Sequence, residues 1–312
     1  YIGGMVFLFC YNVATGIFTA LGDSKTPLYF LIGSSVGNVA LDYLFVAVFH
    51  FGVSGVGWAT FLAQGIAGIL AVITLLRRVA KLPTGHGKVM LYSKSMLRRI
   101  AKIAVPSILQ QSFVSVGNIF IQSLVNSFGS AVIAGYSAAI KLNTFTITSF
   151  STLGNALSSF SAQNIGAAKI DRVRKGFRAG TMLAWIIAVP FFVLFFFFGN
   201  EMLRIFMENP TGGAMKAGMA FLKIVSPFYF IISLKLLADG LLRGSSAMIG
   251  FMVSTFTDLI LRVILAYVFA GLFGSTGIWM SWPVGWSISA IISLLFYRYT
   301  WKQLSVERRL LK

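Results

Sequence analysis

Charged residues and ligand-type side chains are scarce in this sequence. Only 11% of its 312 residues are charged against 57% apolar, with eight acidic residues, two histidines and one cysteine. A soluble domain needs roughly a quarter of its residues charged to cover its surface, so a soluble protein is excluded. One cysteine and two histidines exclude a disulfide scaffold, a zinc cluster and a thiolate metal site. No GxxxxGK[ST] run is present, so the chain carries no ATPase motor of its own.

Apolar stretches fill most of the chain, and each is separated from the next by a short polar break. A membrane-spanning helix needs about 20 predominantly apolar residues. The expected spans are residues 3–21, 27–49, 56–76, 101–125, 131–158, 179–199, 217–241, 248–271 and 277–297. The sequence therefore predicts an all-α, polytopic membrane protein with nine spans in the lipid bilayer.

The net charge of +18 reflects where the basic residues lie. Most of the 26 lysines and arginines fall in alternate connections, namely residues 22–26, 77–100, 159–178, 242–247 and from 298 onward. The connections on the other side carry only Arg204 and Lys216. This asymmetry is the positive-inside pattern, which places the basic segments and the C-terminus in the cytoplasm. We therefore expect a cell (inner) membrane protein and no nucleic-acid partner.

Three glycines recur at one constant offset along the chain. Gly22, Gly52 and Gly55 match Gly244, Gly274 and Gly277, with similar neighbours. Two copies with the same orientation predict parallel repeats, each part of one lobe. The second copy follows three further helices, so we expect the first lobe to be N-terminally truncated by three helices. The expected domains are residues 1–80 (helices 4–6), a cytoplasmic linker 81–96, the second lobe 97–300 (helices 7–12) and a basic cytoplasmic tail 301–312.

Two motifs resemble a known family. One is the run Gln163-Asn164-Ile165-Gly166-Ala167 before a basic segment, and the other is the Asn38-x-x-x-Asp42 pattern in span 27–49. Together they resemble the multidrug and toxic compound extrusion (MATE) family along essentially the whole chain. The resemblance implies twelve helices in two six-helix lobes, a central cavity, and export of organic cations or amphiphiles in exchange for Na+ or H+.

Three carboxylates lie within expected spans: Asp42, Asp239 and Asp258. An ionisable group at membrane depth costs several kcal/mol and is a functional candidate unless a partner explains it. Lys235 lies four residues before Asp239, and Arg262 lies four residues after Asp258, so each acid can pair along its own helix. We expect these two second-lobe pairs to be structural, with a charge relay as the alternative.

Asp42 differs because no cation lies within one helical turn of it, and its i−4 neighbour is Asn38. A carboxylate without a partner in a low dielectric attracts a proton or a metal cation. Na+ prefers carboxylate, amide and hydroxyl oxygens, which Asp42, Asn38 and Thr60 can supply. By resemblance these positions match the family's cation site in the first lobe. The alternatives are polar contacts between helices and a salt bridge from Asp42 to Lys141.

A polar stripe follows Pro106 in span 101–125. Its members recur at helical spacing and are Gln110, Gln111, Asn118 and Gln122. They either line a substrate cavity or pack against a neighbouring helix. Lys141 has no acid nearby in sequence, and it either snorkels, pairs with a distant carboxylate or joins that cavity.

The residues thus predict a secondary antiporter rather than an enzyme. It would work by alternating access, with no cofactor apart from the coupling ion Na+ or H+, as a monomer acting on a small organic cation or amphiphile. A lipid-linked oligosaccharide or polysaccharide flippase is the nearest alternative. A membrane-embedded enzyme would need clustered His, Asp or Glu at the membrane interface, which this chain does not show.

Overall fold

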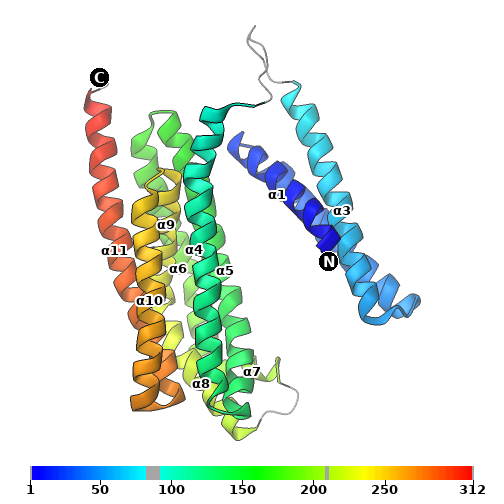
Figure 1. The fold of residues 1–312 in the computed structure, drawn as a ribbon, viewed down its shortest axis with the longest axis vertical. Coiled ribbons are helices and arrows are strands. Elements are labelled where there is room, and N and C mark those ends of the chain that lie inside the picture. Colours follow the sequence, from blue (N-terminus) through cyan, green and yellow to red (C-terminus); the bar gives the residue numbers. More distant parts are fainter. Residues whose placement is uncertain (1, 82–91, 208–210, 311–312) are drawn as a thin grey trace. The chain divides into compact units, whose positions relative to one another are not determined.

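The computed structural model describes residues 2–81, 92–207 and 211–310, and every regular element within them is a helix (Figure 1). The chain divides into unit 1, Tyr1–Leu91, and unit 2, Tyr92–Lys312. Unit 1 contains η1 (Ile2–Gly4), α1 (Met5–Ala20), α2 (Lys25–Tyr43), the π-helix η2 (Leu44–Val48) and α3 (Gly52–Val79). Unit 2 contains α4 (Lys94–Asn126), α5 (Ser130–Gly166), α6 (Ile170–Phe197), α7 (Gly199–Arg204), α8 (Gly212–Val225), η3 (Ser226–Phe228), α9 (Tyr229–Gly244), α10 (Met248–Phe273) and α11 (Ser275–Leu310).

Seven helical segments of the described chain are long and apolar enough to cross a membrane. They are Lys25–Val48, Gly52–Val79, Lys94–Asn126, Ile170–Phe197, Gly212–Gly244, Met248–Phe273 and Ser275–Gln303. Of the nine expected spans, the two outside this set correspond to α1, which has 16 residues, and to α5, which has 37. The predicted fold class, an all-α polytopic membrane protein, is confirmed.

Several helices extend beyond the apolar stretches from which they were predicted. α4 begins at Lys94 rather than at 101, α5 ends at Gly166 rather than at 158, and α6 begins at Ile170 rather than at 179. An apolar run reports the thickness of the hydrocarbon core, whereas helical hydrogen bonding continues into polar sequence beyond it. The QN-x-GA run consequently forms the last turn of α5, where the Asn164 side chain donates to the Phe160 carbonyl at 2.8 Å.

A short polar turn joins α1 to α2. Asp23 accepts a hydrogen bond from the Thr26 backbone N–H through Oδ1 at 3.1 Å, and another from the Thr26 hydroxyl through Oδ2 at 2.8 Å. These bonds, the backbone one first, lower the pKa of Asp23, because they stabilise the ionised carboxylate. Asp23 therefore caps the N-terminus of α2, the helix that carries Asp42.

Two of the three glycine pairs of the repeat have matching surroundings in the structure, whereas Gly22 has a positive φ and its counterpart Gly244 does not. Gly52 and Gly274, at the starts of α3 and α11, have φ of 57° and 62°, which favour glycine because a Cβ would be strained there. Three residues on, Gly55 and Gly277 pack against the preceding helical segment, where an added Cβ would lie 3.2 Å from the Phe45 carbonyl oxygen and 2.0 Å from that of Phe269. Both copies thus make the same turn.

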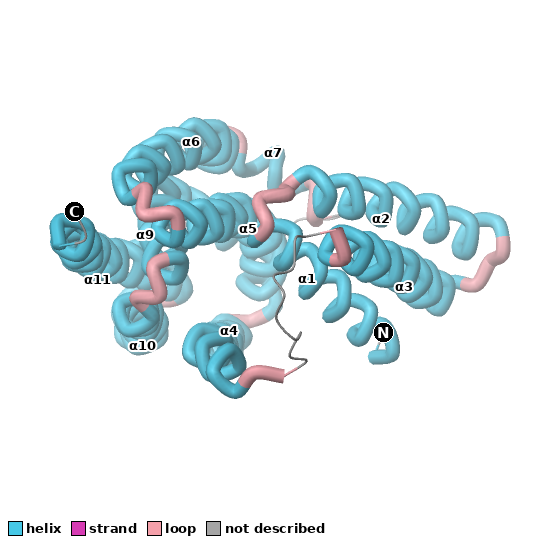
Figure 2. Tube along the Cα trace, turned by 90° about the horizontal axis from the view of Figure 1, so that it is seen from above, coloured by secondary structure: helices cyan, strands magenta, loops and turns pink. Residues whose placement is uncertain are grey.

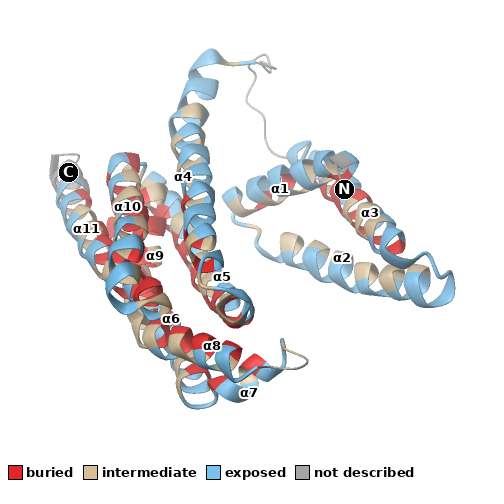
Figure 3. Cartoon of the chain, turned by 60° about the horizontal axis from the view of Figure 1, so that its bottom comes forward, coloured by how far each residue is buried: buried red, intermediate tan, exposed pale blue. Residues whose placement is uncertain are grey.

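Helix α9 lies at the centre of unit 2. It packs against α5, α6, α10 and α11, as the view in Figure 2 shows. Ten of its 16 residues are buried, among them Lys235 and Asp239, whereas α2 of unit 1 has none (Figure 3). The central position of α9 places its charged residues deep inside the helix bundle.

Glycines bring α5 close to its neighbours. A Cβ added at Gly240 of α9 would lie 2.1 Å from the Gly154 carbonyl oxygen of α5, and one at Gly135 would lie 2.2 Å from the Ala214 carbonyl oxygen of α8. Membrane helices lack a hydrophobic driving force between them, so they rely on such small residues for close backbone packing. Gly154 and Gly240 therefore set the distance at which α9 sits against α5.

We expect Gly240→Ala to destabilise unit 2 by about 1–3 kcal/mol, because the new methyl group meets backbone rather than a movable side chain. Gly271→Ala is the matched control: it lies in α10 with open space around its Cβ. Unfolding by SDS in mixed micelles, followed by circular dichroism, measures both. Equal stability of the two variants would contradict the packing argument.

The Asp23 cap predicts a pH effect. Its pKa is lowered in the folded protein, so its stabilising contribution is present above the ordinary value of 3.8 and is lost as the pH falls through the lower, folded value. Asp23→Ala should therefore lower the melting temperature at pH 7, and this difference from the parent protein should shrink in strong acid. Asp23→Asn keeps a capping oxygen and should retain most of the stability.

Candidate functional site

A cavity of about 520 Å³ lies inside unit 2. Residues of α4, α5, α9, α10 and α11 line it, so its shape depends on the helix packing described above. Polar amides and hydroxyls form much of its wall, and tryptophan and tyrosine rings add apolar surface. Its lining includes Lys235, Asp258 and Arg262. A cavity of this size can hold a small organic molecule.

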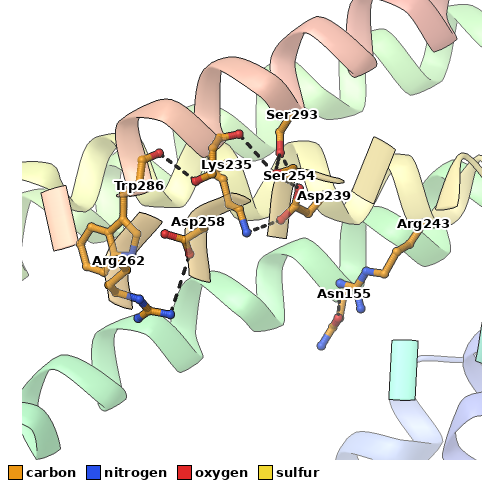
Figure 4. Close-up of polar contacts among 10 residues, drawn as sticks. Asn155, Lys235, Asp239, Arg243, Ser254, Asp258, Arg262, Trp286 and Ser293 are labelled. Carbon is orange, nitrogen blue, oxygen red and sulfur yellow. Dashed lines mark hydrogen bonds and ion pairs between the residues drawn. The ribbon is translucent and has the colours of Figure 1, made fainter. Parts of the chain in front are cut away.

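Lys235 and Asp239 form a closed ion pair at one part of this cavity. The Lys235 Nζ lies 2.7 Å from Asp239 Oδ2, and both side chains are almost fully buried (Figure 4). The other carboxylate oxygen, Oδ1, accepts hydrogen bonds from the hydroxyls of Ser293 at 2.6 Å and Ser254 at 3.4 Å. The predicted i,i+4 pair is therefore present, with both oxygens of its carboxylate satisfied.

Asp258 and Arg262 face each other less closely. The Arg262 Nη2 lies 4.0 Å from Asp258 Oδ2, which is beyond hydrogen-bond distance (Figure 4). The other oxygen, Asp258 Oδ1, and the Arg262 Nε are buried without a hydrogen-bond partner in the described structure. The sequence predicted two equivalent pairs, and the structure instead contains one closed pair and one open pair.

The predicted polar stripe of α4 lines the same cavity. Gln110, Gln111, Asn118 and Gln122 are all among its wall residues. Of the two readings of this stripe, a cavity wall or contacts between helices, the geometry therefore agrees with the cavity. Gln122 also donates to the Asn126 side chain of its own helix at 2.8 Å.

Lys141 is placed elsewhere. It is exposed and lines a separate pocket with residues such as Ser137 and Thr211, and its Nζ lies 5.7 Å from the centre of the Phe206 ring. Lys141 was grouped with the α4 stripe because it lies in a span without a nearby acid. Its position on α5 turns it away from the cavity that the stripe lines.

The sequence analysis missed several residues of the cavity wall. Thr144, Thr148 and Ser151 of α5 recur at spacings of three and four residues, which was a usable signal of one polar helix face. Trp282 and Trp286 of α11 also line the cavity. The sequence analysis did not single them out, because nothing in the sequence shows which aromatic residues face a cavity and which face lipid.

In unit 1, α2 presents two polar atoms without partners. Asn38 Nδ2 and Asp42 Oδ1 are buried and have no hydrogen-bond partner among the described residues. Asp42 lies one residue from the end of α2, directly before the π-helix Leu44–Val48, a type of irregularity that is frequent at functional sites. Thr60, the third predicted ligand, is half-buried on α3, which packs against α2. The unpartnered carboxylate oxygen of Asp42 fits a site for a cation or a proton, whereas the Asn38 Nδ2 is a hydrogen-bond donor that needs an acceptor.

The helices that can span a bilayer, with ionisable groups buried inside them, define a polytopic membrane protein with the features of a small-molecule transporter. The MatE family model matches residues 106–268. The chain is 31% identical over 308 residues to the probable multidrug resistance protein YpnP of Bacillus subtilis, which covers 97% of this chain and 67% of that protein. It is 28% identical to the probable multidrug resistance protein YoeA of the same organism, with the same coverage. The chain thus spans about two thirds of the length of these relatives.

The fold also matches solved structures. One, described as a crystal structure of MATE in the bent conformation, has a TM-score of 0.86 and 19% sequence identity, and the match covers 98% of this chain and 68% of that one. With the family model matching more than half of its residues, the chain belongs to the MATE family of multidrug efflux transporters. It is therefore a member of a transporter family and not an enzyme, and the flippase alternative is not favoured.

Removing only one charge of the Lys235–Asp239 pair should lower the stability of the protein. Lys235→Met leaves the Asp239 carboxylate buried without its cation, and we expect a loss on the order of 3–5 kcal/mol. The double variant Lys235→Met/Asp239→Leu removes both charges and should recover most of that loss. Unfolding in SDS mixed micelles compares the three proteins. Equal losses in the single and double variants would show that the two charges do not stabilise the fold as a pair.

Proposed function

We propose that the protein is a secondary antiporter that exports organic cations or amphiphilic drugs in exchange for Na+ or H+. The observation that carries the proposal is the buried Asp42 Oδ1 on α2, which has no hydrogen-bond partner among the described residues. Leaving a buried carboxylate oxygen without a partner costs stability, and a site that binds an ion in one state supplies the missing partner. The multidrug resistance relatives support efflux as the direction of transport.

The proposed mechanism is alternating access. A proton or Na+ reaching Asp42 neutralises the carboxylate and changes the packing of α2 on α3, where the π-helix already departs from regular hydrogen bonding. Coupling of this kind is reciprocal, so the ion lowers the affinity for substrate by the same factor as the substrate lowers the affinity for the ion. The cavity of unit 2 is the proposed place of substrate contact, through Gln110, Gln111, Asn118 and Gln122.

The proposal also includes an orientation. The basic segments and the C-terminus face the cytoplasm, and the protein resides in the cytoplasmic membrane as a monomer, with the coupling ion as its only cofactor. The excess of Lys and Arg in alternate connections supports this orientation.

Asp42→Asn should abolish gradient-driven efflux while leaving membrane insertion intact. The measurement is efflux of a fluorescent organic cation from proteoliposomes, driven separately by a Na+ gradient and by a pH gradient. Asp23→Asn, in the polar turn of the same unit, is the control and should transport normally, because asparagine retains the helix cap. Normal coupled efflux by Asp42→Asn would assign Asp42 a structural role.

Two further variants distinguish the ion. Thr60→Val and Asn38→Leu remove neutral oxygens that would bind Na+, whereas a proton needs only the carboxylate. If Na+ is the coupling ion, both variants should weaken efflux driven by Na+. If H+ is the coupling ion, efflux driven by the pH gradient should persist in Thr60→Val. If folded protein shows no efflux under the Na+ gradient and none under the pH gradient, the antiport proposal is contradicted.

A further inference from the structure

The cavity of unit 2 is lined by a guanidinium group whose Nε has no hydrogen-bond acceptor among the described residues. Arg262 is only 7% exposed, and its side chain is one of the cavity's wall residues. The centre of its guanidinium lies 4.7 Å from the centre of the Trp282 ring, a cation–π arrangement. No hydrogen bond from Arg262 is present in the part of the chain that the structure describes.

The Asp258 carboxylate does not supply the missing hydrogen-bond acceptor. Asp258 Oδ2 lies 4.0 Å from the Arg262 Nη2, and its other oxygen points toward Gly285 of α11, where an added Cβ would be 2.8 Å away. The missing side chain at Gly285 leaves room for that oxygen. Asp258 is therefore close enough to lower the cost of the buried positive charge but too far to occupy the donors of the guanidinium.

The Lys235–Asp239 pair shows that the wide separation of Asp258 and Arg262 is not a consequence of their spacing along the helix. Lys235, four residues before Asp239, makes a 2.7 Å contact with it. Arg262 and Asp258 have the same separation along their helix and are also buried, yet they stay apart. A buried cation without hydrogen bonds destabilises the protein unless another group accepts hydrogen bonds from it. The donors of Arg262 are thus available to an acceptor that enters the cavity.

We propose that Arg262 is the anion-binding point of this cavity, so that the ligand carries a carboxylate or another oxyanion beside its apolar body. The planar, forked guanidinium matches a carboxylate with two parallel hydrogen bonds. Trp282, Trp286 and Tyr136 line the same cavity and add apolar surface beside the guanidinium. The inference rests on the proposed function only in taking this ligand to be the transported substrate, and it deepens that function by naming the residue that would bind the acidic group of an amphiphilic substrate.

The test compares two dyes that differ at a single group: rhodamine B, which has a free carboxylate, and its ethyl ester. Fluorescence anisotropy measures their binding to the protein in lipid nanodiscs, with no ion gradient. The parent protein should bind rhodamine B about tenfold more tightly than the ester, as expected for one charge-assisted contact. Arg262→Gln should remove this preference by weakening rhodamine B alone.

Asp258→Asn should change the affinity for rhodamine B in the opposite direction. It removes the negative charge 4.0 Å from the Arg262 guanidinium, which would repel the carboxylate of the dye, so rhodamine B should bind more tightly while the ester binds as before. Arg172→Gln is the matched control, because Arg172 is an exposed cation in the first turn of α6, and both dyes should bind it as they bind the parent protein.

Equal affinity of the parent protein for the two dyes would overturn the inference. So would a loss of both dyes together in Arg262→Gln, because the guanidinium would then only support the cavity wall. If Arg262→Gln does not fold, Asp258→Asn decides: selective tightening of rhodamine B supports the site, and its absence refutes it. A protein that binds the acid selectively but does not exchange it along either gradient contradicts the antiport proposal alone.

Discussion

The interior of unit 2 depends on how charges are paired in a medium without water. α9 carries Lys235 and Asp239 into the centre of the bundle, where an isolated charge would be unstable. The 2.7 Å contact between them, with Ser254 and Ser293 on the second carboxylate oxygen, removes that cost. Gly240, the residue after Asp239, is in close backbone contact with Gly154 of α5.

Spacing along a helix predicted much of this and also shows where such prediction stops. An interval of four residues identified Lys235–Asp239 and Asp258–Arg262 as pairs, because it places side chains on one helix face. It could not show that one pair closes and the other stays at 4.0 Å, because that difference depends on the neighbouring helix. The space at Gly285 on α11, which accommodates the Asp258 oxygen, lies far from it in the sequence.

The same limit applies to the cavity wall and to the helix ends. The polar stripe of α4 could be predicted because its amides recur on one helix face, and these residues do line the cavity. Lys141 could not be placed, since a lone lysine in an apolar span has no periodic partner that reveals its direction. Helix bounds such as the end of α5 at Gly166 were underestimated for a related reason: hydropathy measures where lipid begins and not where helical hydrogen bonding ends.

The two units differ in the chemistry they offer. The ionisable group of α2 is a half-buried carboxylate with an amide neighbour, and its buried Oδ1 suits a cation or a proton. The cavity of unit 2 instead contains two cations, one already satisfied by Asp239 and the other open at Arg262. If a zwitterionic substrate binds at Arg262 and a cation at Asp42, the two ligands do not compete for the same charge. Reciprocal coupling between them would then have to arise from helix packing rather than from displacement at a shared carboxylate, because only a difference in affinity between two conformations can link separate sites.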